Sequence, residues 1–126
     1  MRLIGPINTG QTAGGAGVST ANATTTTRVE GMLVGVYVKY NGSPPAGTTD
    51  VTVKTKGGDG AAPTTTFLTL TNAATSGWFF PRINIHNTSG SAQAAVWDYF
   101  PIWDFVTVTI AQANDADSAD VWLMVE

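Results

Sequence analysis

The chain has 126 residues and a formal net charge of -3, and only 12% of its residues are charged. This length suits one domain, and the charged fraction is about half of the ~25% usual in soluble proteins. Without cysteine there is no disulfide framework, thiolate metal site or cysteine nucleophile. The acidic balance argues against a nucleic-acid partner. No apolar run reaches the ~20 residues of a membrane span, and the N-terminus lacks the apolar core of a secretory signal. We therefore expect neither a nucleic acid nor a membrane as partner.

The first 17 residues differ in composition from the rest of the chain. Four glycines fall within the eight residues from Gly10 to Gly17, and the segment has no hydrophobic period. Such a composition favours an extended, flexible conformation. The sequence therefore predicts an N-terminal arm over 1–17, with Leu3, Ile4 and Ile7 as candidate contacts in a groove of a neighbouring subunit; a frayed terminus is the alternative.

Residues 18–126 have the pattern of a single all-β domain. Short runs rich in β-branched residues alternate with clusters of Gly, Pro, Asn, Asp and Ser, and no stretch has a helical period. Eight strands are predicted, over Ser19–Val29, Met32–Tyr40, Asp50–Lys56, Thr65–Thr71, Trp78–Asn87, Ser91–Trp97, Ile102–Ala111 and Asp120–Glu126. Alternating apolar and polar residues are typical of antiparallel strands with one buried face. Eight such strands suit a β-sandwich of the jelly-roll type.

Several large apolar residues fall on strand faces that the alternation assigns to solvent. A small sandwich cannot bury all of them, and large exposed apolar patches usually mark partner surfaces. They are the candidate oligomer interface: Leu33, Tyr37, Phe67, Phe105, Trp122 and Met124. The alternative is that the arm or the loops cover one sheet.

The sequence shows no constellation of catalytic or metal-binding residues, so we expect neither an enzyme nor a cofactor. The single histidine, His86, lies on a polar strand face without a serine motif around it. The acidic loop with Asp115, Asp117 and Asp120 is predicted to be a solvated turn, with a calcium loop as the alternative. Asp98 and Asp104 flank an aromatic stretch, but nothing places them across a cleft as in a glycosidase.

Four features together resemble the small capsid decoration, or cement, proteins of tailed bacteriophages. They are the Gly/Thr-rich N-terminal segment, the eight short strands, the Gly-Trp-Phe-Phe-Pro-Arg segment at Gly77–Arg82, and the final strand pair at Phe100–Ile110 and Asp120–Glu126. The resemblance implies a jelly-roll or related sandwich without catalytic residues. It also implies a homotrimer that binds the major capsid protein on the outside of the virion head, after synthesis in the host cytoplasm.

Two other functions remain open from the sequence. The four tryptophans at 78, 97, 103 and 122 suit a carbohydrate-binding module, because aromatic rings stack on sugar faces. A small capsid subunit, or a tail or baseplate component, is the other alternative.

Overall fold

The computed structural model describes residues 1–41, 45–58 and 63–126. The connections between the predicted strands Met32–Tyr40, Asp50–Lys56 and Thr65–Thr71 therefore lie partly outside the described residues. The rest is all β, with antiparallel strands and no helix, and no described segment is a helix that is able to span a membrane. The strands are β1 (Arg2–Asn8), β2 (Ser19–Thr24), β3 (Val29–Asn41), β4 (Asp50–Thr55), β5 (Thr66–Leu70), β6 (Gly77–Phe79), β7 (Ile83–His86), β8 (Ala92–Asp98), β9 (Phe100–Asp104), β10 (Val106–Ala113) and β11 (Ser118–Val125).

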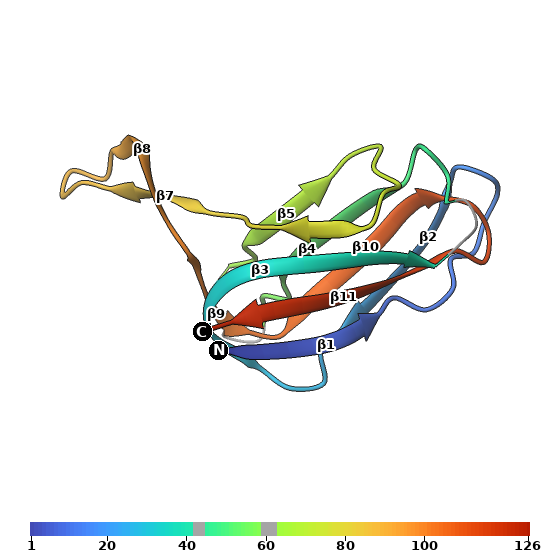
Figure 1. Ribbon diagram of the computed structural model, residues 1–126, viewed down its shortest axis with the longest axis horizontal. Helices are drawn as coiled ribbons and strands as arrows, with labels where there is room; N and C mark the ends of the chain where they lie inside the picture. The colour runs from blue at the N-terminus through green and yellow to red at the C-terminus, as the bar shows by residue number, and fades with distance from the viewer. Residues whose placement is uncertain (42–44, 59–62) are drawn as a thin grey trace.

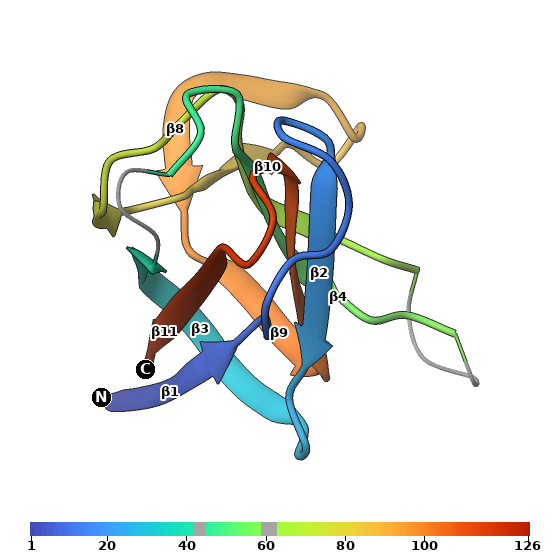
Figure 2. The same cartoon turned by 90° about the vertical axis from the view of Figure 1, so that its right-hand side faces the viewer.

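Two antiparallel sheets pack face to face, as the sequence predicts (Figures 1 and 2). The first sheet has the order β1-β11-β3-β6, and β9 also pairs with β3; the second has the order β2-β10-β4-β5. A separate ribbon of β7 and β8 extends away from the sandwich (Figure 1). The described residues thus form eleven strands instead of eight, because two predicted strands divide and the arm supplies another.

The predicted arm is not free, because its first part is a strand of the first sheet. Arg2–Asn8 pairs with β11, so Ile7 is buried and Ile4 packs against the core, while Leu3 remains 60% exposed. A bulge interrupts the pairing between Ile4 and Ile7. At Gly5 the backbone has a φ of +137°, and a Cβ there would lie 2.7 Å from the Val121 carbonyl oxygen. Glycine here is a requirement of close packing.

The remainder of the predicted arm is attached to the turn between β10 and β11. Thr9 and Thr12 are both buried. The Thr9 N–H donates to the Ala119 carbonyl and the Thr12 N–H to the Asp117 carbonyl, at 3.0 and 2.7 Å. In return, the Ala119 and Asp117 N–H groups donate to the two threonine hydroxyls, each at 3.0 Å. The segment from Arg2 to Thr12 is therefore held against the sandwich.

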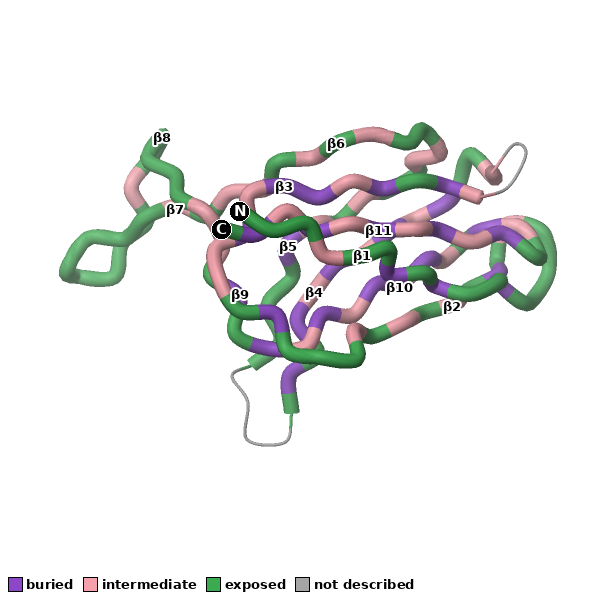
Figure 3. The backbone as a smooth tube through the Cα atoms, turned by 60° about the horizontal axis from the view of Figure 1, so that its bottom comes forward, coloured by how far each residue is buried: buried purple, intermediate pink, exposed green. Residues whose placement is uncertain are grey.

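Valine, isoleucine and leucine side chains from both sheets fill the core between them. Figure 3 marks the buried residues along the backbone of the two sheets. Leu33 is fully buried there and Phe67 nearly so, so the prediction that they face solvent is wrong. Met124 of β11 pairs with Gly35 of β3, but the next residue of β11, Val125, pairs with Leu33. One extra residue on β3 therefore lies between the two pairs, and it reverses the alternation of inward and outward side chains along that strand. A similar shift in the pairing of β4 with β5 turns Phe67 inward, where its ring lies 5.4 Å from that of Phe100. Bulges of this kind exchange the faces of all residues beyond them.

Candidate functional site: an aromatic face and a projecting hairpin

Large apolar side chains cover the outer surface of the first sheet. The strand register places Trp122, Tyr37 and Trp78 side by side on β11, β3 and β6, and Leu3 opposite Met124 in the next row. The Tyr37 ring lies 5.3 Å from Trp78 and 5.7 Å from Trp122, and Trp78 stacks on Phe80 at 6.1 Å. We call this surface the aromatic face: Leu3, Tyr37, Trp78, Phe80, Trp122 and Met124.

The aromatic face is a shallow, open hollow instead of a deep pocket. A depression of about 230 Å³ is lined by Leu3, Tyr37, Trp78 and Trp122. Leu3 and Phe80 are about 60% exposed at its borders. Gly35 lies beneath Phe80, and a Cβ at this position would come within 3.1 Å of the Phe80 ring. The surface is therefore wide enough for a flat apolar partner.

Polar groups border one end of the aromatic face. The Asp120 carboxylate accepts hydrogen bonds from the Asn8 and Asn41 side-chain amides, at 2.6 and 3.0 Å. Lys39 is opposite Asp120 in the register of β3 and β11. Asp120 on β11 pairs with Asn8 on the edge strand β1 and with Lys39 on the central strand β3, so these three polar residues form a row across the sheet. An apolar patch with a polar rim has the anatomy of a protein–protein interface.

The second apolar surface is the ribbon of β7 and β8, which projects from the sandwich (Figures 1 and 3). Its large side chains are exposed: Ile83, Ile85, Val96 and Trp97. No Asp, Glu, Lys or Arg occurs from residue 83 to 97. The Asn84 side chain donates to the Gln93 carbonyl at 3.1 Å across the ribbon. The Asn87 side chain accepts from the Ser89 and Ser91 N–H groups at its tip. We call Ile83–Asp98 the hairpin.

Arg82 fixes the base of the hairpin to the sandwich. Its guanidinium donates to the Val34 carbonyl of β3 at 2.9 Å and to the neighbouring Pro81 carbonyl at 2.8 Å. The same group lies 4.4 Å from the centre of the Tyr99 ring, which follows β8. Both legs of the hairpin are thereby tied to one point on β3, and this fixes the direction in which the ribbon projects.

The structure brings together only part of the predicted interface. Tyr37, Trp122 and Met124 lie on the aromatic face, whereas Phe105 lies apart from it, between the cations of Arg28 and Lys56 at 5.2 and 5.8 Å. Leu3 joins the aromatic face from the predicted arm. The sequence marks Trp78 only as one of four tryptophans and Phe80 only as part of the Gly77–Arg82 segment, because the face of a strand cannot be assigned around Pro81.

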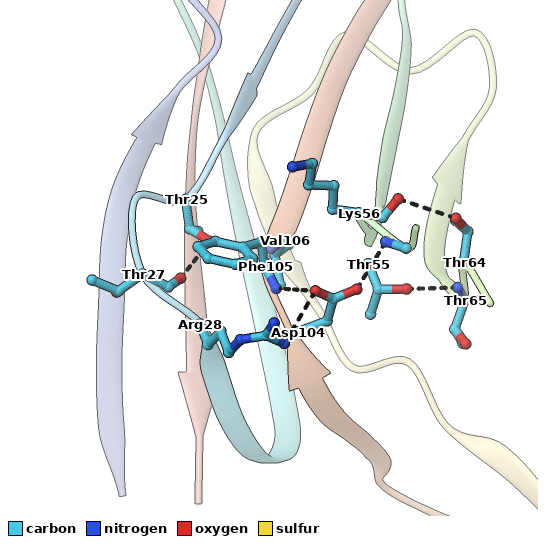
Figure 4. A network of polar contacts seen from close by, with 11 residues as sticks. Thr25, Thr27, Arg28, Thr55, Lys56, Thr64, Thr65, Asp104, Phe105 and Val106 are labelled. Atoms are coloured by element: carbon cyan, nitrogen blue, oxygen red, sulfur yellow. Dashed lines mark hydrogen bonds and ion pairs between the residues drawn. The ribbon is translucent and has the colours of Figure 1, made fainter. Parts of the chain in front are cut away.

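Asp104 belongs to a structural network beside Phe105 (Figure 4). The buried carboxylate accepts hydrogen bonds from the Phe105 N–H at 2.7 Å and the Gly57 N–H at 2.8 Å, and Arg28 lies 3.8 Å away. It thus joins β9, β10 and the segment after β4. Asp98, by contrast, is exposed and accepts from the adjacent Tyr99 N–H. Nothing in these contacts makes the two carboxylates a catalytic pair.

The other polar candidate residues are either exposed or take part in hydrogen bonds that hold the fold together. His86 is exposed on the hairpin. Asp117 is buried at the turn before β11, where it accepts from the Asn114 N–H. Asp120 holds the two asparagines at the polar border. Within residues 1–41, 45–58 and 63–126, no three histidine or carboxylate side chains are grouped as metal ligands.

Compared with known proteins, the chain matches no family model and no curated protein. The two apolar surfaces are therefore the features from which a function is inferred.

Proposed function

We propose that this chain is a structural protein of a virion: a bacteriophage capsid decoration protein that binds the outside of the head as a homotrimer and stabilises the shell. The observation that supports it is the pair of uncharged apolar surfaces on a chain with only 12% charged residues. Isolated monomers rarely expose such patches. The capsid as partner rests on the resemblance of the sequence to decoration proteins.

We further propose that the sandwich is a jelly roll. The last two strands of the chain support this, because β11 lies between β1 and β3 while β10 lies between β2 and β4. With β6 beside β3 and β5 beside β4, the two sheets have the interleaved order expected of two Greek keys. The strands β7, β8 and β9 are then an insertion before the last pair. Jelly rolls occur in many capsid proteins, so the fold agrees with the proposed function.

The mechanism of stabilisation would be differential binding. A protein that binds the assembled shell, but not its free subunits, stabilises the shell in proportion to its occupancy. Three identical contacts in one trimer raise the effective affinity well above that of a single contact. No group needs to react, which agrees with the structural roles of Asp104 and Asp117 in the sandwich.

The proposed function is tested with heads that lack the protein. Purified protein is added, and bound protein is quantified after sedimentation of the heads, together with the temperature at which the heads release their DNA. We expect saturable binding at a mass of three chains per site and a raised release temperature. Binding to tails or baseplates instead of heads would favour the other virion component. Absence of binding to any of these particles would contradict the proposal.

A carbohydrate-binding module remains the alternative function. The observation that favours it is the exposure of tryptophan rings, since Trp103 on β9 is 74% exposed and Trp97 on the hairpin 56%. Such rings offer flat apolar faces to sugars. A glycan array separates the two functions: specific glycan binding that is lost in Trp103→Ala would favour the carbohydrate module, and no binding to any glycan would eliminate it.

A further inference from the structure

We propose that the hairpin of one copy docks on the aromatic face of a second copy, and that three such head-to-tail contacts close the ring. This inference rests on the proposed homotrimer and names the surfaces that form it. The hairpin (Ile83–Asp98) is the inserted element, with Trp97 as its largest anchor. The aromatic face receives it across β1, β11, β3 and β6.

The hairpin needs a partner for its own stability. A two-stranded ribbon is at best marginally stable in water unless it packs against something else. Here the contacts to the sandwich are at its base, through Arg82, while Ile85, Val96 and Trp97 are at least 40% exposed. Packing one face of the hairpin against a second copy would remove part of this apolar surface from water.

The two surfaces have similar amounts of exposed apolar area. With ~150–250 Å² for a large aromatic side chain, their exposed fractions leave about 400 Å² of large apolar side chain on the hairpin and about as much on the aromatic face. On the hairpin this area is divided between two faces, because Trp97 pairs with Asn84 and so lies opposite Ile83 and Ile85. One contact through the Trp97 face would then bury about 600 Å² from these residues, and neighbouring polar atoms and strand backbone would have to supply the rest of the ~1,200–2,000 Å² of a stable interface.

The two surfaces also match in charge. Residues 83–97 of the hairpin contain no Asp, Glu, Lys or Arg, and neither do the six residues of the aromatic face. Interface centres are depleted of charged residues because unpaired charges are costly to bury. On the sandwich, Asp120 and Lys39 lie one row beyond Trp122 and Tyr37, and Glu126 follows Met124 by two residues at the other end of the aromatic face. They would form the rim of the contact.

The direction in which the hairpin projects determines the symmetry of the proposed assembly. It projects away from the sandwich of its own chain (Figure 1), and the aromatic face of that chain is uncovered, with Leu3 and Phe80 about 60% exposed. Donor and acceptor are thus different patches of one molecule. Contacts between different patches are heterologous, and they generate a ring when the rotation between copies closes. Three copies close the ring that the decoration proposal requires.

Two single substitutions and their mixture test the contact. Trp97→Asp places a charge on the hairpin, and Leu3→Asp places a charge on the aromatic face. Both side chains are exposed, so the core is unaffected. Trp103→Asp, at an exposed tryptophan on neither surface, is the matched control. Mass is measured by light scattering after chromatography, and far-UV circular dichroism checks folding. Should Leu3→Asp not fold, Phe80→Asp replaces it.

We expect wild type and Trp103→Asp to have the mass of three chains. Each of the other variants alone should be monomeric, with association weakened roughly thirtyfold or more, as for a hot-spot residue. Their equimolar mixture should form a dimer with one copy of each, because one intact hairpin then meets one intact face and the ring cannot close. A trimeric Trp97→Asp, or a mixture that stays monomeric, would overturn the proposed contact.

Failure of this contact and failure of the proposed function give different results. If the protein binds heads but Trp97→Asp remains trimeric, the decoration function is supported and the proposed contact is contradicted. If the variants dissociate as expected but the wild type binds no head, the proposed contact is supported and the decoration function is contradicted.

Discussion

Tyr40 is a buried polar residue whose hydroxyl makes no hydrogen bond with the described part of the chain. Burial, and secondarily the charge of Asp50, raises the pKa of Tyr40 from 10.0 to about 12. The raised pKa means that the folded state favours the neutral phenol. Its contribution to stability is therefore complete below pH 10 and is lost as the pH rises toward 12.

We expect the free energy of unfolding to fall by up to about 3 kcal/mol between pH 10 and 12, at 1.36 kcal/mol for each unit of pKa shift. Urea denaturation at several pH values measures it. In Tyr40→Phe this loss should be absent, and stability at pH 7 should be unchanged or higher, since the variant lacks the unpaired hydroxyl. An equal alkaline loss in the variant would contradict this assignment.

Asp104 shows how one residue can connect three segments. Asp104→Ala leaves the Gly57 and Phe105 N–H groups without an acceptor, and we expect a loss of about 2–4 kcal/mol on chemical denaturation. Arg28→Gln is the control: its side chain is half exposed and its ion pair is long, at 3.8 Å, so the loss should stay below about 1 kcal/mol. Equal losses in both variants would mean that the ion pair, and not the backbone contacts, carries the effect.

At the scale of elements, β1 covers one edge of β11. Deletion of residues 2–8 would expose this edge and remove Ile4 and Ile7 from the core. We expect a loss of several kcal/mol, since each large buried side chain contributes about 2 kcal/mol or more. Deletion of Met1 alone is the control and should change nothing. If the larger deletion were equally stable, residues 1–17 would behave as the free arm that the sequence predicts.

The hairpin, in contrast, is separable from the sandwich. Ile83 pairs with Asp98 at its base, so a Gly-Asn turn in place of residues 84–97 would connect two neighbouring ends. We expect this variant to keep a cooperative unfolding transition, measured by circular dichroism, because these residues contribute no side chain to the core. Loss of the cooperative transition would contradict the view of the hairpin as a peripheral insertion.

At the scale of the whole molecule, the low charge content determines how the proposed trimer should respond to salt. Apart from Asp98 at the base of the hairpin, the surfaces that would meet contain no charged residues, so association should be driven by apolar burial. We expect the mass by light scattering to be unchanged between about 0.05 and 1 M salt, whereas contacts through exposed charges would weaken over this range. Dissociation at high salt would point to an ionic interface.

The all-β class and most strand positions could be predicted from the sequence, because alternation and turn residues act locally. Alternation along β3 and β11 places Val36, Val38, Val121 and Leu123 on one face of the sheet, and all four are buried in the core. Tyr37, Trp122 and Met124 were also assigned to the correct face of the sheet. No bulge separates these positions in the pairing of β3 with β11, so the alternation holds there.

Only the tertiary structure decided which apolar residues remain outside. The bulge beside Gly35 moves Leu33 into the core, and pairing with β11 converts the predicted arm into an edge strand. The projection of the hairpin likewise depends on the contact of Arg82 with the Val34 carbonyl, 48 residues away in the chain. Bulges and long-range pairing depend on the partner strand, so the local pattern of one strand does not encode them. The sequence alone determined that this protein has more apolar surface than a small core can hold, and the structure determined where that surface lies.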